Sequence, residues 1–145
     1  MDQTSSSPSR DESVPSIVLI EDNQTDVFLV KEALAAHGLN VKLEVMEDGE
    51  QAIGFISQID ADAKAQCPRL FVIDLSLPRM TGLEVLASVR RSKRCAHSPV
   101  LIITSSDADK DRAESAALGA TAYFTKPSGY AAFLKLGEVI HQLLS

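Results

Sequence analysis

The segment from Leu70 to Pro78 constrains the fold more than any other part of the chain. Four consecutive apolar residues lead directly into Asp74, and a proline follows soon after. A run this short and this apolar is typical of a parallel strand that is buried on both faces. Asp74 would then lie at the carboxyl end of that strand, where open α/β sheets bind their ligands. Alternatively, Asp74 could simply close a core strand in a turn. The other segments of the chain distinguish these two interpretations.

The hydrophobic pattern on both sides of this segment alternates between strand-like and helix-like stretches. Strands are predicted at Ser16–Ile20, Val41–Met46, Leu70–Asp74, Pro99–Ile103 and Ala120–Phe124. The second of them alternates apolar and polar residues, which suits a strand near the edge of the sheet. Amphipathic helices are predicted at Gln24–His37, Gln51–Ile59, Gly82–Arg91, Asp109–Leu118 and Ser128–Leu144. Such alternation implies right-handed crossovers, so we expect an α/β fold with a doubly wound, five-stranded parallel sheet and five helices.

The 145 residues are predicted to form a short tail and one domain. Residues 1–15 are rich in serine, proline and charge, so we expect a disordered tail there and a folded domain over residues 16–145. No apolar run reaches the roughly 18–20 residues that a membrane-spanning helix needs, and no signal peptide is recognisable. We therefore expect a cytoplasmic protein, and we interpret Cys67 and Cys95 as free thiols in a reducing compartment.

The net charge of −6 argues against a broad nucleic-acid interface, which needs a basic stripe. One basic cluster follows the third predicted helix and contains Arg90, Arg91, Lys93 and Arg94. Positive charges are favoured at the carboxyl end of a helix, and no aromatic residues lie between them. We interpret the cluster as a solvated helix end and expect neither nucleic acid nor a membrane as a partner.

Four predicted strands end in polar side chains, namely Glu21 with Asp22, Asp74, Thr104 and Lys126. The carboxyl ends of parallel strands open on one edge of the sheet, so these groups can converge. Two carboxylates about 4 Å apart repel each other by on the order of 4 kcal/mol at an effective dielectric constant of about 20. The acids therefore need a cation, and a hard, oxygen-rich site suits Mg²⁺.

Lys126 and Thr104 add an ammonium group and a hydroxyl group next to Asp74 in this arrangement. A phosphoryl group on a carboxylate needs positive charge and hydrogen-bond donors around its three free oxygens. The pattern predicts that Asp74 is a nucleophile in phosphoryl transfer.

Four segments in this order resemble the receiver domain of bacterial two-component response regulators. They are Val18–Asn23, Ile73–Glu84, Pro99–Ser105 and Gly119–Pro127, and the resemblance extends over residues 16–145. The spacing from Asp74 to Thr104 and Lys126 is that of the family. The interval from Asp22 to Asp74 is longer, and in this the chain is similar to stand-alone receivers that pair with phytochrome-type histidine kinases.

The resemblance implies a flavodoxin-like fold and a set of roles for the residues at the sheet edge. Asp74 would accept a phosphoryl group from a sensor histidine kinase. Glu21, Asp22, Asp74 and the carbonyl group of Ser76 would bind Mg²⁺. Ser76 also occupies one of the two positions that tune the loss of the phosphoryl group, and Ser106 occupies the other.

The remaining roles that the resemblance implies concern the other side of the site. Thr104 and Lys126 would bind the phosphoryl group, and a cis peptide bond would join Lys126 to Pro127. Tyr123 would be the switch residue that turns inward when Thr104 moves toward the phosphoryl group.

The output of such a receiver would be contact with a downstream protein that the sequence does not identify, and not enzymatic turnover. The final helix bears on this output, because it shows two apolar stripes. The second stripe contains Ala132, Leu136, Val139 and Leu143. A second apolar side implies a second burial. We therefore predict a homodimer or partner surface through the last helix and strand.

Three alternatives have to be weighed against this interpretation. An aspartate-nucleophile phosphatase of the haloacid-dehalogenase type would need a second acid two residues after Asp74, where this chain has Ser76. A flavodoxin-like binding module would need a phosphate loop rich in small residues where Glu21 and Asp22 stand. A pseudo-receiver would only bind partners, and the presence of Asp74 together with Lys126 argues against it.

Overall fold

Short segments rich in valine, isoleucine and leucine form the strands of the protein, whose computed structural model describes residues 14–145. The strands are β1 (Ser16–Ile20), β2 (Lys42–Met46), β3 (Leu70–Asp74), β4 (Val100–Thr104) and β5 (Ala122–Thr125). They form one sheet in the order β2-β1-β3-β4-β5, and all neighbouring strands are parallel. Every residue of β3 and β4 is buried, which confirms the fully buried central strand that the apolar run predicts.

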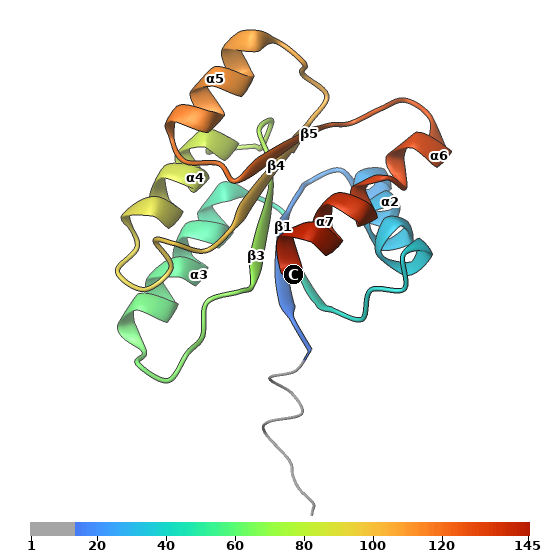
Figure 1. Cartoon of the computed structure of the whole chain (residues 1–145). Coiled ribbons are helices and arrows are strands. Elements are labelled where there is room, and N and C mark those ends of the chain that lie inside the picture. Colours follow the sequence, from blue (N-terminus) through green and yellow to red (C-terminus); the bar gives the residue numbers. More distant parts are fainter. Residues whose placement is uncertain (1–13) are drawn as a thin grey trace, which may run out of the picture.

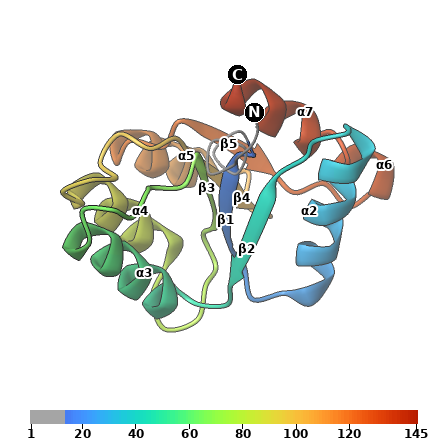
Figure 2. The same cartoon turned by 90° about the horizontal axis from the view of Figure 1, so that it is seen from below.

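Two layers of helices cover the two faces of the sheet (Figures 1 and 2). One layer contains α3 (Gly49–Ala61), α4 (Gly82–Arg91) and α5 (Asp109–Ala117), and the other contains α2 (Gln24–Ala36), α6 (Tyr130–Phe133) and α7 (Leu136–Leu144). Alternate residues of the inner strands supply the two cores. In β1, Val18 and Ile20 pack in the core with α3 and α4, whereas Ile17 and Leu19 pack in the core with α2 and α7. The predicted doubly wound α/β fold is confirmed.

The last predicted helix is divided into α6 and α7, so the prediction of one continuous helix is wrong. Hydrogen bonds from residue i to i−3, such as Lys135 N to Ala132 O and Gly137 N to Leu134 O, tighten the backbone between the two pieces. Tight turns of this kind advance about 120° per residue instead of 100°, and they rotate α7 relative to a regular helix.

With this rotation, the second apolar stripe of the final helix does not face outward as predicted. Leu136 is 0% exposed and lies in the core together with Phe133 and Ile140. Val139 and Leu143 are half-buried and pack against the same core. Gly137 allows the close approach, because a Cβ atom there would lie 2.4 Å from the carbonyl oxygen of Ala33 in α2.

Cys67 and Cys95 form a disulfide bond, so the prediction of two free thiols is wrong. Cys67 lies in the loop between α3 and β3, and Cys95 lies in the loop between α4 and β4. The fold brings these two loops side by side, with the Cα atoms 5.6 Å apart. The sequence could not show this pairing, because it depends on the packing of α3 against α4.

Two members of the basic cluster hold loops together, so the interpretation as a solvated helix end is wrong for them. The Arg90 guanidinium donates to the carbonyl oxygens of Gly119, Ala96 and Ser98 at 2.7–3.0 Å. Arg94 donates to the carbonyl oxygens of Ile59 and Asp62. Arg91 and Lys93 are exposed, as predicted.

The predicted disordered tail lies outside the described residues, apart from its last two positions. None of the helices within residues 14–145 combines the length and the apolar character that spanning a membrane requires.

Candidate functional site

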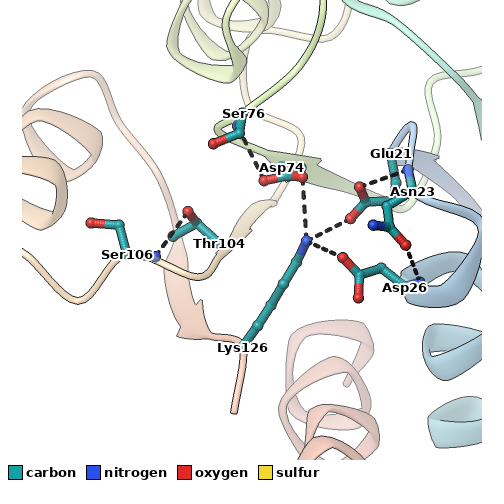
Figure 3. A network of polar contacts seen from close by, with 8 residues as sticks. All are labelled: Glu21, Asn23, Asp26, Asp74, Ser76, Thr104, Ser106 and Lys126. Carbon is teal, nitrogen blue, oxygen red and sulfur yellow. Dashed lines mark hydrogen bonds and ion pairs between the residues drawn. The ribbon is translucent and has the colours of Figure 1, made fainter. Parts of the chain in front are cut away.

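The carboxyl ends of three strands bring acidic side chains and one lysine together (Figure 3). Glu21 directly follows β1, Asp74 is the last residue of β3, and Lys126 directly follows β5. The carboxylate oxygens of Glu21, Asp22 and Asp74 lie within 4.8 Å of one another. Glu21 is 0% exposed and Asp74 is 5% exposed, whereas Asp22 is open to solvent. The structure therefore gathers these acids at one sheet edge, as the parallel topology predicts.

The Lys126 ammonium group lies at the centre of this network. Its Nζ atom donates to Glu21 Oε1 at 2.8 Å, to Asp26 Oδ2 at 2.7 Å and to Asp74 Oδ2 at 3.3 Å. Asp26 belongs to the first turn of α2, and sequence reasoning missed it. Asp26 lies four residues after Asp22, about one helical turn further on, and this spacing could have indicated that it reaches the same site. Acids are common in the first turn of any helix, however, so the signal was weak.

The charges at this site shift two pKa values. Burial raises the pKa of Glu21 to about 7; the hydrogen bond from Lys126 opposes the rise, and the neighbouring Asp74 adds to it. Burial alone would lower the pKa of the Lys126 ammonium, but its hydrogen bonds to Asp26 and Glu21 and the charge of Asp74 raise it above the ordinary value. Glu21, Asp22, Asp26 and Asp74 outnumber the one ammonium group, so negative charge is in excess.

The loop after β3 holds the Asp74 carboxylate in place. The backbone N–H of Ser76 donates to Asp74 Oδ1 at 3.1 Å. Gly82, the first residue of α4, packs so closely that a Cβ atom there would lie 2.2 Å from the Asp74 carbonyl oxygen. A capping box between Thr81 and Glu84 starts α4 at this point. The helix start, the glycine and the serine amide together fix the end of β3.

Thr104 and Tyr123 lie on the side of the site formed by β4 and β5. Thr104 is 2% exposed, and its hydroxyl oxygen accepts a hydrogen bond from Ser106 N at 3.2 Å. The Tyr123 hydroxyl donates to the Ser106 carbonyl oxygen at 2.8 Å, and the Arg112 guanidinium lies 4.5 Å from the centre of its ring. Ser106 therefore links Thr104 to Tyr123.

The predicted cis peptide bond between Lys126 and Pro127 is wrong, because no peptide bond within residues 14–145 is cis. The trans form is the intrinsically favoured isomer even before proline. In this conformation the backbone N–H of Lys126 donates to the Thr104 carbonyl oxygen at 2.7 Å, which continues the pairing of β5 with β4.

The donor set fits a hard divalent cation. The three clustered acids supply only oxygen ligands, and one of them is exposed, so solvent molecules can complete the coordination. The excess of carboxylates over ammonium groups also favours a second positive charge at this edge. Zinc and iron centres generally use histidine or cysteine ligands, which this cluster lacks within the described residues.

The chain matches the family described as the response regulator receiver domain over residues 17–136. It is 34% identical to the response regulator Rcp1 of Synechocystis over 118 residues, which are 80% of this chain and 80% of that protein. It is 30% identical to a probable methanogenesis regulatory protein, FilR2, of Methanothrix harundinacea, with 79% of this chain and 73% of that protein covered.

Solved structures show the same similarity. The phosphorylated cyanobacterial phytochrome response regulator RcpA superimposes with a TM-score of 0.80 at 29% identity, covering 90% of this chain and 94% of that chain. The Mn²⁺-bound form of Rcp1 superimposes with a TM-score of 0.77 at 30% identity, covering 88% of this chain and 92% of that chain.

Proposed function

This chain belongs to the response regulator receiver domain family, and from that premise we propose that its Asp74 accepts a phosphoryl group from a histidine kinase. The family takes its phosphoryl group from such kinases and binds a divalent metal ion. We assign the receiver domain to residues 16–145, and we propose Mg²⁺ as its cation. The family match gives no support to the alternative of an aspartate-nucleophile phosphatase.

The observation that supports this assignment best is the position of Asp74. Its carboxylate lies next to the acids Glu21 and Asp22, and the Lys126 ammonium is 3.3 Å away. An oxygen of Asp74 would form the new bond to phosphorus while the bond from phosphorus to the imidazole nitrogen of the kinase breaks. The electron pair of that broken bond leaves with the imidazole.

The residues around Asp74 orient the group that is transferred. Glu21, Asp22, Asp74 and the Ser76 carbonyl group would hold the cation, whose charge neutralises phosphoryl oxygens when it is bound. Lys126 supplies an ammonium group, and Thr104 supplies a hydroxyl donor. Two effects thus support transfer, namely positioning and charge neutralisation.

We propose that the phosphorylated state is transmitted through Thr104 and Tyr123. Both side chains bond to Ser106, so a movement of the Thr104 hydroxyl toward a phosphoryl group would break a link that also holds Tyr123. Such a change would alter the surface that β5 and α5 present to a downstream protein. The output is then protein contact without enzymatic turnover.

We propose a phytochrome-type histidine kinase as the phosphodonor and the cytoplasm as the location. The similarity to RcpA, a phytochrome response regulator, and to Rcp1 supports the class of kinase. The location rests on the sequence alone. A homodimer through the last helix and strand stays a prediction, and it loses its main argument because Leu136 is buried in the core.

The phosphoacceptor can be tested with a small phosphodonor. We expect the wild-type protein to gain one phosphoryl group from acetyl phosphate and Mg²⁺, as measured by intact mass under mild conditions. Asp74→Asn should gain none, because it lacks the nucleophilic oxygen, while Asp62→Asn, at an exposed position on another loop, should behave as the wild type. Label that survives acid treatment or persists in Asp74→Asn would refute the assignment, since an acyl phosphate is acid-labile.

A further inference from the structure

Asp26 contributes a fourth carboxylate to the site, and the family-derived roles leave it unassigned. Its Oδ2 atom lies 2.7 Å from Lys126 Nζ, whereas the nearest Asp74 oxygen lies 3.3 Å from the same nitrogen. The Lys126 side chain is 8% exposed and that of Asp26 is 22% exposed, so the pair is largely screened from water. The ammonium group is therefore held closer to Asp26 than to Asp74 (Figure 3).

The start of α2 fixes Asp26 in this position. The Asn23 side chain caps the helix and accepts a hydrogen bond from Asp26 N at 3.0 Å. Within the described residues, the Asp26 carboxylate has Lys126 as its one hydrogen-bond partner. The cap places the backbone of Asp26 within reach of Lys126, and the ion pair with the ammonium group holds the carboxylate there.

The three hydrogens of the ammonium group are shared among Glu21, Asp26 and Asp74. Glu21 and Asp74 are also two of the three acids that could hold a cation. A hydrogen bond from Lys126 to either of these carboxylates competes with a metal ion for that carboxylate, whereas its bond to Asp26 does not.

We propose that Asp26 is a positioning residue that draws the Lys126 ammonium away from Asp74 and so leaves the Asp74 carboxylate to a divalent cation. This inference rests on the proposed function, because it assigns a residue to the same metal and phosphoryl site.

The inference predicts that Asp26→Asn binds Mg²⁺ more weakly. Without the Asp26 charge, the ammonium group shifts toward Asp74, and we expect the dissociation constant measured by isothermal titration calorimetry to rise roughly tenfold. Asp26→Glu keeps the charge and should stay within about threefold of the wild type. A purely structural role would lower the melting temperature of Asp26→Asn without changing its affinity for Mg²⁺.

Glu47→Gln serves as the matched charge control. Glu47 is exposed, directly follows β2 at the same sheet edge, and would lose the same charge without touching Lys126. We expect a much smaller change in affinity for this variant. Equal weakening in Asp26→Asn and Glu47→Gln would overturn the inference, because the effect would then reflect net charge alone.

A double-mutant cycle tests whether Asp26 acts through Lys126. In a Lys126→Met background, Asp26→Asn should weaken Mg²⁺ binding only as much as Glu47→Gln does, since there is no ammonium group to redirect. The full tenfold effect in that background would also overturn the inference.

The Lys126 ammonium signal in ¹⁵N-edited NMR gives a readout that needs no metal. It should shift in Asp26→Asn and keep its position in Glu47→Gln, and an unchanged signal in Asp26→Asn would contradict the inference. A wild-type protein that binds no Mg²⁺ would instead contradict the proposed function.

Discussion

Glu21 is fully buried, and it is one of three carboxylates that share the Lys126 ammonium group. Its exposed fraction is 0%, and its Oε1 atom accepts the bond from Lys126 at 2.8 Å. A buried carboxylate without enough positive charge around it retains its proton to a higher pH. Without a metal ion, Glu21 therefore keeps its proton to a higher pH than an exposed glutamate does.

We expect the metal-free protein to become less stable as the pH rises from about 4.5 to about 7. The unfolded chain releases the Glu21 proton near its ordinary pKa of 4.5, and the folded protein releases it at about 7. Between these values the folded state binds more protons than the unfolded state, so the free energy of unfolding falls with rising pH, by at most about 3 kcal/mol. Lys126 does not interfere, because its raised pKa adds stability that is lost only above pH 10.5.

Urea unfolding at a series of pH values, with Glu21→Gln as the control, measures this contribution. The glutamine keeps the shape of the side chain but cannot titrate, so the difference between the two proteins isolates Glu21. A slope that is equally steep in both proteins would contradict the prediction. Millimolar Mg²⁺ should flatten the wild-type slope, because the cation favours the ionised carboxylate.

At the scale of elements, two kinds of cross-link join the loops that lead into the strands, at the end of the sheet opposite the site. The disulfide bond between Cys67 and Cys95 joins the loops that follow α3 and α4. Arg90 joins the end of α4 to the turn at Gly119, which precedes β5. Both links constrain loops and leave the acidic cluster free of direct contact with them.

Reduction of the disulfide bond should lower the free energy of unfolding by about 3 kcal/mol, since the bond closes a loop of moderate length in the unfolded chain. The bonded residues are 28 positions apart. Urea midpoints with and without a reductant, with thiol titration to confirm reduction, provide the measurement. Cys67→Ala should be insensitive to the reductant, and a wild-type midpoint that does not move on reduction would refute the prediction.

The elements that could be predicted from the sequence are those whose pattern is local. The Leu70–Asp74 strand and the Gly82–Arg91 helix have the predicted bounds, because hydrophobic period and caps set them. Leu136 was assigned to the wrong face, because the tight turn before α7 changes the helical phase. The ion pair of Asp26 with Lys126 and the disulfide bond depend on packing between distant segments, which no local pattern encodes.

At the scale of the whole molecule, the clustered acids of the site lower the stability of the folded protein. Carboxylates that repel one another in the native state lie far apart in the unfolded chain, so the repulsion favours unfolding. A cation that binds only the native cluster reverses this effect by mass action.

Millimolar Mg²⁺ should therefore raise the melting temperature of the wild-type protein. Asp74→Asn relieves the repulsion, so without metal it should melt about 3 °C higher than the wild type, and its response to Mg²⁺ should be smaller. Thermal scans of both proteins, with Asp62→Asn as a control remote from the site, would test this. A wild-type melting temperature that is the same with and without Mg²⁺ would contradict the clustered-carboxylate picture.

The position of Lys126 after the edge strand β5 has a consequence for the order in which the protein folds. Glu21 and Lys126 are 105 positions apart, and Asp74 lies between them in the sequence. Contacts of such high separation form late and slowly, because the chain entropy of a long loop has to be lost first. An intermediate that has joined β1 to β3 would present the acids without their ammonium group. Docking of β5 then brings in the one ammonium group, so the site is complete only when the last strand has joined the sheet.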